Sequence, residues 1–378
     1  MSDIDSKVRV PRKTVFLFIL LAVLLVSSLL VFYIMLNSAD QTIDGMIHVR
    51  NEKELTNAVN NAIKPTIITL DNDIKLIKTF TIKYNKDVIL TSNHKNDNFY
   101  KLIGAKEQHT IAIEEGGLLQ LDGIWVTHAN NAGWGCGVII FGGHLLMTDG
   151  IISGNDGGGV YVNYGSFNMT GGEISHNISD FYGGGGVYNR VNFTMTGGVI
   201  TNNSGNEGGG VNNIGTFTLY DGNIFDNTAR VDGGGVFNVG TFNMTGGNIF
   251  DNTAGVGGGV SMSGGFFTLT DGEISNNTAI ESGGGVYVGY GIFTMSSGEI
   301  SNNVAGTDGG GISIFGSFNL SGGKIISNQA GRNGGGILYY FEGKFSLSGG
   351  EISCNTAVSN GNDVYTNYDK GHVVLSQE

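Results

Sequence analysis

Three repeated series of side chains in this sequence could do chemistry. The first series is acidic and precedes glycine triplets that recur through the second half of the chain; its members are Asp156, Glu207, Asp232, Glu281 and Asp308. Stacked carboxylates at a turn could bind Ca²⁺ through oxygen. Because Gly183, Val256 and Asn333 interrupt the series, we favour solvated turn residues and predict no metal site.

The second series follows another glycine turn and contains Glu173, Glu273, Glu299, Lys324 and Glu351. Two carboxylates roughly 5–10 Å apart across a sugar could hydrolyse a glycosidic bond. Like charges repeated along a solenoid more often face solvent, so we predict no catalytic residue here. The histidines have no zinc-binding spacing, and no cofactor is expected.

The third series is partly aromatic. If Val160 and Val162 point inward, the residue between them and its equivalents in other repeats point outward. Exposed rings beside Asn and Ser could stack on sugars; alternatively, they shield the strands or fit against glycine turns. The candidate ligand-binding stripe consists of Tyr161, Tyr188, Phe237, Tyr287 and Tyr339.

The elements that must position these series repeat at intervals of 24 to 27 residues. A triple glycine precedes Val or Ile, an aromatic–x–Met/Leu pair follows, and a single Ile then precedes an Asn by three residues. The last glycines of the triplets are Gly159, Gly186, Gly210, Gly235, Gly259, Gly285, Gly311 and Gly336. A fixed period of this length predicts a solenoid, and the alternation of apolar residues predicts strands.

The predicted fold is therefore all-β, a parallel β-helix of about twelve coils of about 25 residues each. The Val, Phe, Met and Ile columns should point inward and stack on their equivalents. The recurring Asn predicts a structural ladder of side-chain amides at one corner, formed by Asn155, Asn177, Asn203, Asn227, Asn252, Asn277, Asn303, Asn328 and Asn355.

The pattern GGG[VI]–x(5–7)–F–x–[ML]–x–x–G–x–I–x–x–N resembles the right-handed, pectin-lyase-like β-helix repeats of adhesin-like surface proteins. It is also similar to the GGA[IVL] and FxxN repeats of chlamydial polymorphic membrane proteins. The resemblance covers residues 43–378 and implies a right-handed β-helix at a cell surface. Such repeats serve adhesins and enzymes alike. The enzymes should carry an Arg or Lys base near calcium-binding Asp residues, or paired Asp motifs, and neither occurs here.

The chain before the repeats divides into a tail, an anchor and a cap. Residues 1–13 are basic and predict a cytoplasmic tail, while the uncharged residues 14–36 predict a transmembrane signal anchor. A cleaved signal peptide, leaving a secreted rod, is the alternative. Residues 37–65 predict a linker and an N-terminal cap, residues 66–156 irregular coils, and residues 157–378 regular ones.

The predicted cap contains a short amphipathic helix that ends at Pro65. Leu55, Val59 and either Ala62 or Ile63 should share its apolar face. Such a helix would cover the first coil, whose open strand edges otherwise invite aggregation.

Charge and cysteine content restrict the partners. The net charge of −13 disfavours nucleic acid and anionic lipid, and Cys136 and Cys354 lie too many coils apart for a disulfide. We expect a non-catalytic, membrane-anchored extracellular protein with a cytoplasmic N-terminus, adhesin-like or structural in the cell envelope. Its expected partners are the membrane, through residues 14–36, and glycans or surface molecules of a host or neighbouring cell. The alternative is a polysaccharide lyase or glycoside hydrolase.

Overall fold

A computed structural model describes residues 45–63, 65–93, 98–128, 133–180, 183–340, 344–366 and 373–375. The chain divides after Gly45, and residues 46–378 form one compact unit. The predicted tail and anchor, residues 1–36, lie outside the described residues, as does most of the predicted linker. Within the residues that the structure describes, no helix is long and apolar enough to cross a membrane.

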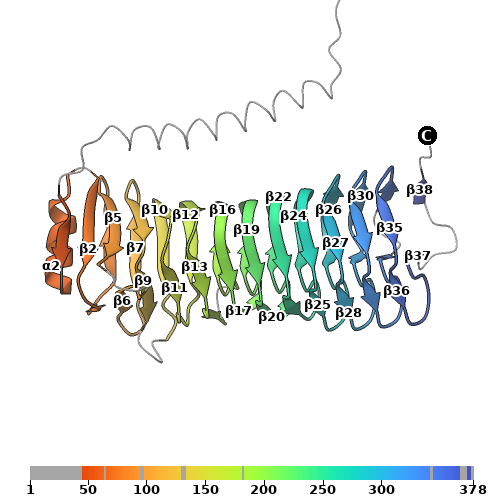
Figure 1. The fold of residues 1–378 in the computed structure, drawn as a ribbon, viewed down its shortest axis with the longest axis horizontal. Helices are drawn as coiled ribbons and strands as arrows, with labels where there is room; N and C mark the ends of the chain where they lie inside the picture. The colour runs from red at the N-terminus through yellow and green to blue at the C-terminus, as the bar shows by residue number, and fades with distance from the viewer. Residues whose placement is uncertain are drawn as a thin grey trace, which may run out of the picture. The chain divides into compact units, whose positions relative to one another are not determined.

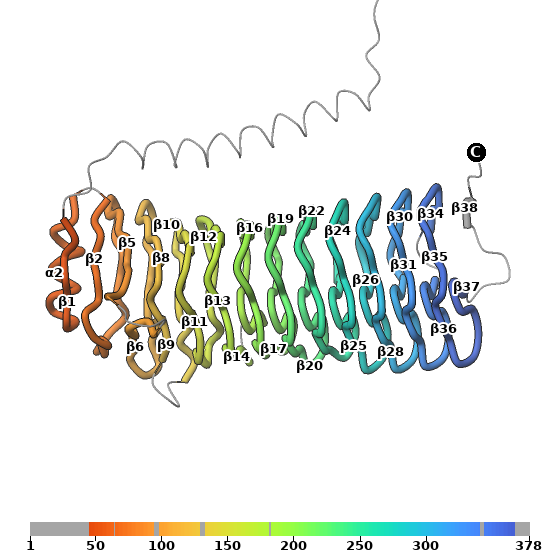
Figure 2. The backbone as a smooth tube through the Cα atoms, viewed as in Figure 1, coloured from red at the N-terminus to blue at the C-terminus, as the bar shows by residue number. Residues whose placement is uncertain are grey.

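Residues 46–378 form a parallel β-solenoid of about twelve turns, which confirms this part of the predicted fold (Figure 1). In the described part of the chain, all paired strands run parallel, in one sheet of 30 strands and a second of 8. Each coil lies against the next one along the chain, as the backbone trace in Figure 2 shows. Equivalent residues of successive repeats therefore become neighbours in space.

The first coils are irregular and contain one helix. Their elements are β1 (Ile47–Val49), α2 (Glu52–Asn61), β2 (Thr66–Leu70), β3 (Ile74–Lys75), β4 (Phe80–Ile82), β5 (Asp87–Ser92), β6 (Lys101–Gly104), β7 (Ile111–Glu114), β8 (Leu118–Asp122), β9 (Trp125–His128), β10 (Val138–Met147) and β11 (Ile151–Ser153).

In the regular coils, the large sheet contains three segments per turn, some of them merged into one long strand. Its strands are β12 (Val160–Met169), β13 (Glu173–Ser175), β15 (Val187–Asn189), β16 (Asn192–Thr201), β18 (Val211–Asn213), β19 (Thr216–Phe225), β21 (Val236–Asn238), β22 (Thr241–Phe250), β24 (Val260–Ser275), β26 (Val286–Met295), β27 (Glu299–Ser301), β29 (Ile312–Ile314), β30 (Ser317–Leu320), β31 (Lys324–Ile326), β33 (Ile337–Tyr339), β34 (Phe345–Leu347), β35 (Glu351–Ser353), β37 (Val364–Thr366) and β38 (Val373–Leu375).

The second sheet comes from a short segment that the sequence analysis missed. Its strands are β14 (Ile178–Ser179), β17 (Ser204–Glu207), β20 (Thr228–Asp232), β23 (Thr253–Ala254), β25 (Thr278–Ala279), β28 (Val304–Ala305), β32 (Gln329–Ala330) and β36 (Thr356–Ala357). Ala254, Ala279 and Ala330 are almost completely buried on it. An Ala two positions after each ladder Asn from Asn227 to Asn355 is the signal that marks this strand in most of the repeats.

The core consists of like residues stacked on like, as predicted. The buried Phe rings from Phe167 to Phe345 form a continuous stack with centroids 4.5 to 5.6 Å apart, close to the spacing of neighbouring strands. The Val, Met and Ile columns beside this stack are buried through most of the solenoid. Because a single coil cannot enclose these side chains, the core depends on the stacking of coils.

Asparagine amides connect the coils along one corner. In each ladder Asn from Asn155 to Asn328, the side-chain N–H donates to Oδ1 of the next ladder Asn at 2.7 to 3.0 Å. The backbone N–H donates to the same oxygen. At the last coil, Asn355 donates to Asp363 at 3.0 Å. These hydrogen bonds pair buried polar groups at a corner where the strand ladder is interrupted.

A second, shorter series of buried amides was not predicted. Asn189 donates to Asn213 and Asn213 donates to Asn238, each at 2.7 Å. These residues occupy the inward register of Val162, so three coils carry an amide where neighbouring coils carry Val162 and Met262. Their N–H groups also reach backbone carbonyls of the turn that follows, which satisfies them inside the core.

Helix α2 packs on the first strands of the solenoid. Asn51 begins it by accepting a 3.0 Å hydrogen bond from the backbone N–H of Glu54. Leu55, Val59 and Ala62 are buried, whereas Ile63 is 93 % exposed. Of the two residues expected to complete the apolar face, Ala62 is therefore the correct one, because the helix ends before Ile63.

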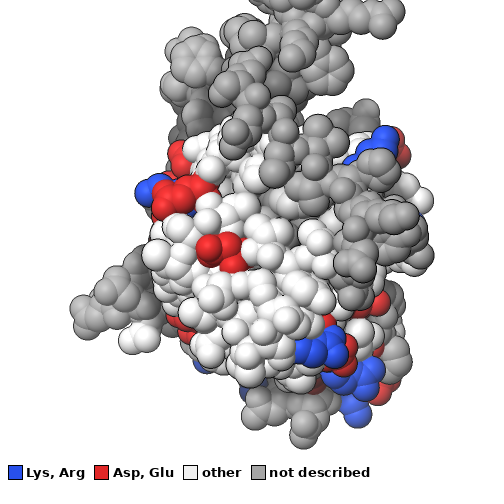
Figure 3. Space-filling model, turned by 90° about the vertical axis from the view of Figure 1, so that its right-hand side faces the viewer, with Lys and Arg blue, Asp and Glu red and all other residues white. Residues whose placement is uncertain are grey.

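The surface of the solenoid carries few charges. In the view along the axis in Figure 3, acidic and basic side chains form small separate groups on a mostly uncharged described surface. Cys136 and Cys354 are both free, as their separation predicts.

Candidate ligand-binding groove

The predicted aromatic series forms one column of neighbouring residues. Strand pairing places Tyr161, Tyr188, Asn212, Phe237, Ser261, Tyr287, Ser313 and Leu338 on adjacent coils in this order. The column is less exposed than predicted: Tyr161, Tyr188 and Tyr287 are half-buried, and Phe237 is only 6 % exposed.

The prediction of exposure is wrong for two residues of the stripe. The first glycine of the triplet lies close to the backbone here: a Cβ atom added at Gly233 would lie 2.7 Å from the backbone nitrogen of Phe237. The Phe237 ring is buried and presents no open face for stacking. Tyr339 lies one residue beyond the column, in the inward register of Ile314, and its ring is part of the core.

A hollow of about 380 Å³ opens where the column residue is small. Ser261 lies between the larger Phe237 and Tyr287, and the hollow above it is bounded by Asp232, Glu281 and Tyr290. The Tyr290 side chain is prominent, with 72 % of the residue exposed. The volume falls within the range of small-molecule sites, which is roughly 300–1,000 Å³.

Aromatic side chains occupy the solenoid on either side of the hollow. Towards the C-terminus, Phe315 lies 5.6 Å from Tyr287 and stacks on Tyr340 at 4.0 Å between ring centroids. Towards the N-terminus, Phe237 fills the column position before Ser261. The residues that line the hollow come from neighbouring coils between Arg230 and Tyr290.

Two acidic residues, Asp232 and Glu281, and one basic residue, Arg230, line the hollow. Burial raises the pKa of Asp232, the hydrogen bond from Ser261 at 3.0 Å lowers it, and the charge of Glu281 raises it further. Burial likewise raises the pKa of the Tyr287 phenol, and Asp232 adds to the effect. Two carboxylates thus share one hollow with a tyrosine, the kind of constellation that binds hydroxyl or ammonium groups.

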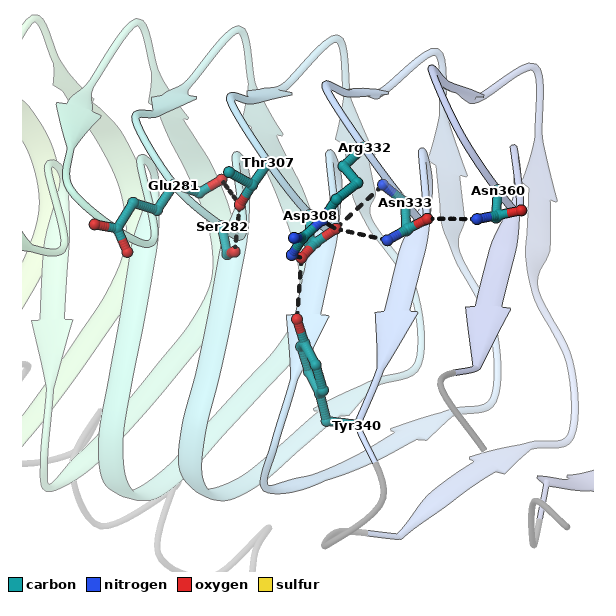
Figure 4. A network of polar contacts seen from close by, with 8 residues as sticks. All are labelled: Glu281, Ser282, Thr307, Asp308, Arg332, Asn333, Tyr340 and Asn360. Atoms are coloured by element: carbon teal, nitrogen blue, oxygen red, sulfur yellow. Dashed lines mark hydrogen bonds and ion pairs between the residues drawn. The ribbon is translucent and has the colours of Figure 1, made fainter. Parts of the chain in front are cut away.

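The first acidic series is only partly a column. Register places Ser282, and not Glu281, between Val256 and Asp308, because the backbone N–H groups of Gly257 and Gly283 donate to Ser282 and Asp308 respectively. Glu281 lies one residue earlier, over Gly255 of the preceding coil, whose carbonyl accepts from its backbone N–H. In Figure 4 its carboxylate extends away from Ser282 and Thr307. The expectation of one stacked acidic series is thus wrong at this coil, since the 26-residue spacing shifts Glu281 out of register.

Asp308 is fully occupied by its own chain. Its carboxylate accepts from the guanidinium of Arg332, from the backbone and side chain of Asn333, and from the Tyr340 hydroxyl at 3.0 Å (Figure 4). Although burial raises the pKa of Asp308, the hydrogen bonds from Arg332 and Tyr340 outweigh it and the pKa is lowered. Among the described residues, no group of three or more His, Cys, Asp or Glu side chains is arranged to hold a metal ion.

The second acidic series is a true column on another strand. Pairing runs from Glu173 through Val199, Asn223 and Asn248 to Glu273, Glu299, Lys324 and Glu351. These side chains are half-buried or exposed, and none of them lines the hollow. The structure therefore brings the first and third predicted series together and leaves the second apart.

A histidine–cysteine contact was missed by the sequence analysis. The Sγ atom of Cys136 lies 2.9 Å from Nδ1 of His109, and the backbone N–H of Cys136 donates to the same nitrogen at 3.2 Å. Burial, followed by the charge of His128, lowers the pKa of His109 to about 4, and burial raises the pKa of the Cys136 thiol to about 12. The thiol thus stays protonated and poorly nucleophilic, so this contact is structural.

Known protein families, curated proteins and solved structures were compared with this chain, and none matches. The resemblance to pectin-lyase-like and chlamydial surface repeats therefore stays a prediction. Function has to be argued from the residues of the hollow.

Proposed function

We propose that this chain is a glycan-binding, non-catalytic protein of the cell surface, held to a membrane by residues 14–36. The supporting observation is the hollow at Ser261, where the Tyr287 and Tyr290 side chains lie beside Asp232 and Glu281. Aromatic rings stack on the apolar faces of sugars, while carboxylates accept hydrogen bonds from sugar hydroxyls.

The rest of the solenoid suits a spacer that presents this site. Its stacked core and asparagine ladder make a stiff body from short repeats. We propose that α2 caps the first coil, since Leu55 and Val59 are buried against the strands there. In this proposal the solenoid is a right-handed, pectin-lyase-like β-helix with an adhesin-like role. Residues 1–13 lie in the cytoplasm.

A glycan array probed with the full chain, solubilised in a zwitterionic detergent without a sugar headgroup, tests the proposal. Tyr290→Ser should weaken binding to the best glycan about tenfold, as expected for loss of one stacking ring. Tyr164→Ser is the matched control, because Tyr164 is also exposed and occupies the corresponding turn of an earlier repeat. Absence of glycan binding, or equal loss in both variants, would contradict the proposal.

A second candidate function is hydrolysis or lysis of a polysaccharide. It is favoured by one observation, namely that Asp232 and Glu281 share the hollow and the pKa of Asp232 is raised by burial. A carboxyl group with a raised pKa is suited to act as a general acid. Release of reducing or unsaturated ends from a bound glycan, abolished by both Asp232→Asn and Glu281→Gln, would favour this function over simple binding.

A further inference from the structure

Asp232 and Asp308 occupy equivalent positions three coils apart, yet their surroundings differ. Both precede a glycine triplet, and backbone hydrogen bonds connect the intervening residues of the same register, Val256 and Ser282. Around Asp308 the chain supplies a cation and a ring, those of Arg332 and Tyr340. The Asp308 network thus shows that a carboxylate at this corner can bind a guanidinium and a ring hydroxyl.

Around Asp232 both of those partners are missing. The backbone N–H of Arg332 donates to Thr307, that of Thr307 to Glu281, and that of Glu281 to Gly255. On the coil after Asp232, Gly255 directly precedes Val256 and its glycine triplet, just as Arg332 directly precedes Asn333 and its triplet on the coil after Asp308, so Gly255 occupies the place of Arg332. Strand register connects Met262 with Tyr339, and Ser263 follows Met262 as Tyr340 follows Tyr339. The hollow is the space that an arginine and a tyrosine fill three coils further on.

A carboxylate, and not a guanidinium, is the second charged group near Asp232. Glu281, which follows Gly255 on the next coil, lines the hollow, so a second carboxylate is present where the Asp308 network has a guanidinium. Arg230 also lines the hollow, but its Nε donates to Asn206 at 2.9 Å. In the described part of the chain it forms no ion pair with Asp232 or Glu281, and Ser261 supplies the one side-chain hydrogen bond to Asp232.

We propose that the hollow selects an amino sugar with a free ammonium group, whose charge and ring replace the missing arginine and tyrosine. The ammonium lies between Asp232 and Glu281, and the sugar ring packs beside Tyr287 and Tyr290. This inference rests on the proposed glycan-binding function and narrows it. It disfavours acidic glycans such as polyuronates, since a ligand carboxylate would meet two like charges.

The test is calorimetric titration of the full chain, in the same detergent, with three tetrasaccharides: a β-1,4-linked glucosamine oligomer, its fully N-acetylated counterpart and an oligogalacturonate. We expect the glucosamine oligomer to bind at least tenfold more tightly than the others. Glu281→Gln should reduce that preference several-fold, and Ser263→Tyr should abolish binding by filling the hollow. Glu299→Gln removes the same charge from the separate acidic column, and it controls for general attraction to an acidic protein.

The outcomes separate the two proposals. Equal or tighter binding of the N-acetylated or acidic oligomer, lost in Ser263→Tyr, would overturn the amino-sugar inference and leave glycan binding at the hollow intact. Equal weakening by Glu281→Gln and Glu299→Gln would also overturn it, because the attraction would then be non-specific. No binding of any oligomer would overturn both. Thermal unfolding of each variant establishes that a loss of binding is not a loss of the fold.

Discussion

The hydroxyl of Ser261 donates a 3.0 Å hydrogen bond to the carboxylate of Asp232, which belongs to the preceding coil. The donor residue is almost completely buried, with 1 % exposed, and the bond joins two neighbouring coils within the lining of the hollow. The bond joins Ser261, whose small side chain leaves room for the hollow, to Asp232, one of the two acidic residues that line it. Geometry and electrostatics of the site therefore depend on each other.

Ser261→Ala should raise the pKa of Asp232 further, because the hydrogen bond from Ser261 is the interaction that lowers it. The accompanying loss of unfolding free energy should be about 1 kcal/mol, as for one hydrogen bond. Carboxyl-detected NMR titration measures the pKa of Asp232, and urea unfolding measures the unfolding free energy. Ser263→Ala, at the exposed rim, is the control, and an unchanged Asp232 titration in Ser261→Ala would contradict the assignment.

Asp232→Asn should stabilise the protein at neutral pH. Burial raises the pKa of Asp232 above the ordinary 3.8, so the folded protein binds the carboxyl proton more tightly than the unfolded chain does. The stability of the protein therefore falls as the pH rises from 3.8 through the raised pKa. An amide removes that cost, and Asn333 shows that Asn fits the equivalent register. The urea midpoint should rise at pH 7, with a difference from wild type that disappears below pH 3.8. Asp180→Asn, which changes an exposed carboxyl, should leave the midpoint unchanged at both pH values.

Asn252→Ala should destabilise the solenoid by about 3–5 kcal/mol, because it strands several buried polar groups at roughly 1–3 kcal/mol each. The Asn252 side chain accepts from the backbone and side chain of Asn227 and donates to Ile224 and Asn277. Urea unfolding checks this value. Asn248→Ala in the same coil is the matched control, since Asn248 makes one half-buried bond to Asn223, and it should lose less than about 1 kcal/mol. Similar losses in both variants would show that the ladder adds no special stability.

The period and the alternation of apolar residues were sufficient to predict the solenoid, because a stacked coil repeats one local pattern. The same pattern placed Val160, Phe167, Met169 and Ile174 inside, where the structure has them. The second sheet was missed because its segments, such as Thr253–Ala254, are too short to show alternation.

The hollow could not be predicted from one column alone. It arises where Gly255, Ser261 and Ser263, from three different registers, are small at the same level of the rod. Predicting it would have required aligning all repeats residue by residue and comparing neighbouring columns. The displacement of Glu281 by one residue, which carries its carboxylate into this space, depends on backbone hydrogen bonds that spacing alone left ambiguous.

Ser327→Asn should stabilise the protein by about 0.5–1 kcal/mol, since Asn tolerates the left-handed conformation better than Ser. Ser327 has a φ of 58° and directly precedes ladder residue Asn328; the equivalent residue of another coil, Asn276, has a φ of 54°. Denaturant unfolding measures the gain. Ser317→Asn on β30 is the control, because Asn192 occupies its register without positive φ, and no gain is expected there. Equal effects at both positions would contradict the conformational explanation.

His109 should make the protein less stable between pH 6.5 and pH 4. Its pKa is lowered to about 4, chiefly by burial and then by the charge of His128, so in this range the unfolded chain binds a proton that the folded protein does not. Stability is therefore complete above the ordinary pKa of 6.5 and falls as pH decreases towards 4, by at most about 3 kcal/mol and by less where solvent screens the ring.

Urea unfolding of wild type and His109→Asn across this pH range isolates the effect, because the amide oxygen can still accept from Cys136 but cannot titrate. The difference in unfolding free energy between the two proteins should shift in favour of the variant as pH falls. His144→Asn, at an exposed histidine that contacts Ser166, should show no such shift. If the unfolding free energies of wild type and His109→Asn instead differ by a constant amount from pH 7 to pH 4, the acid sensitivity originates elsewhere and His109 is not buried as a neutral ring.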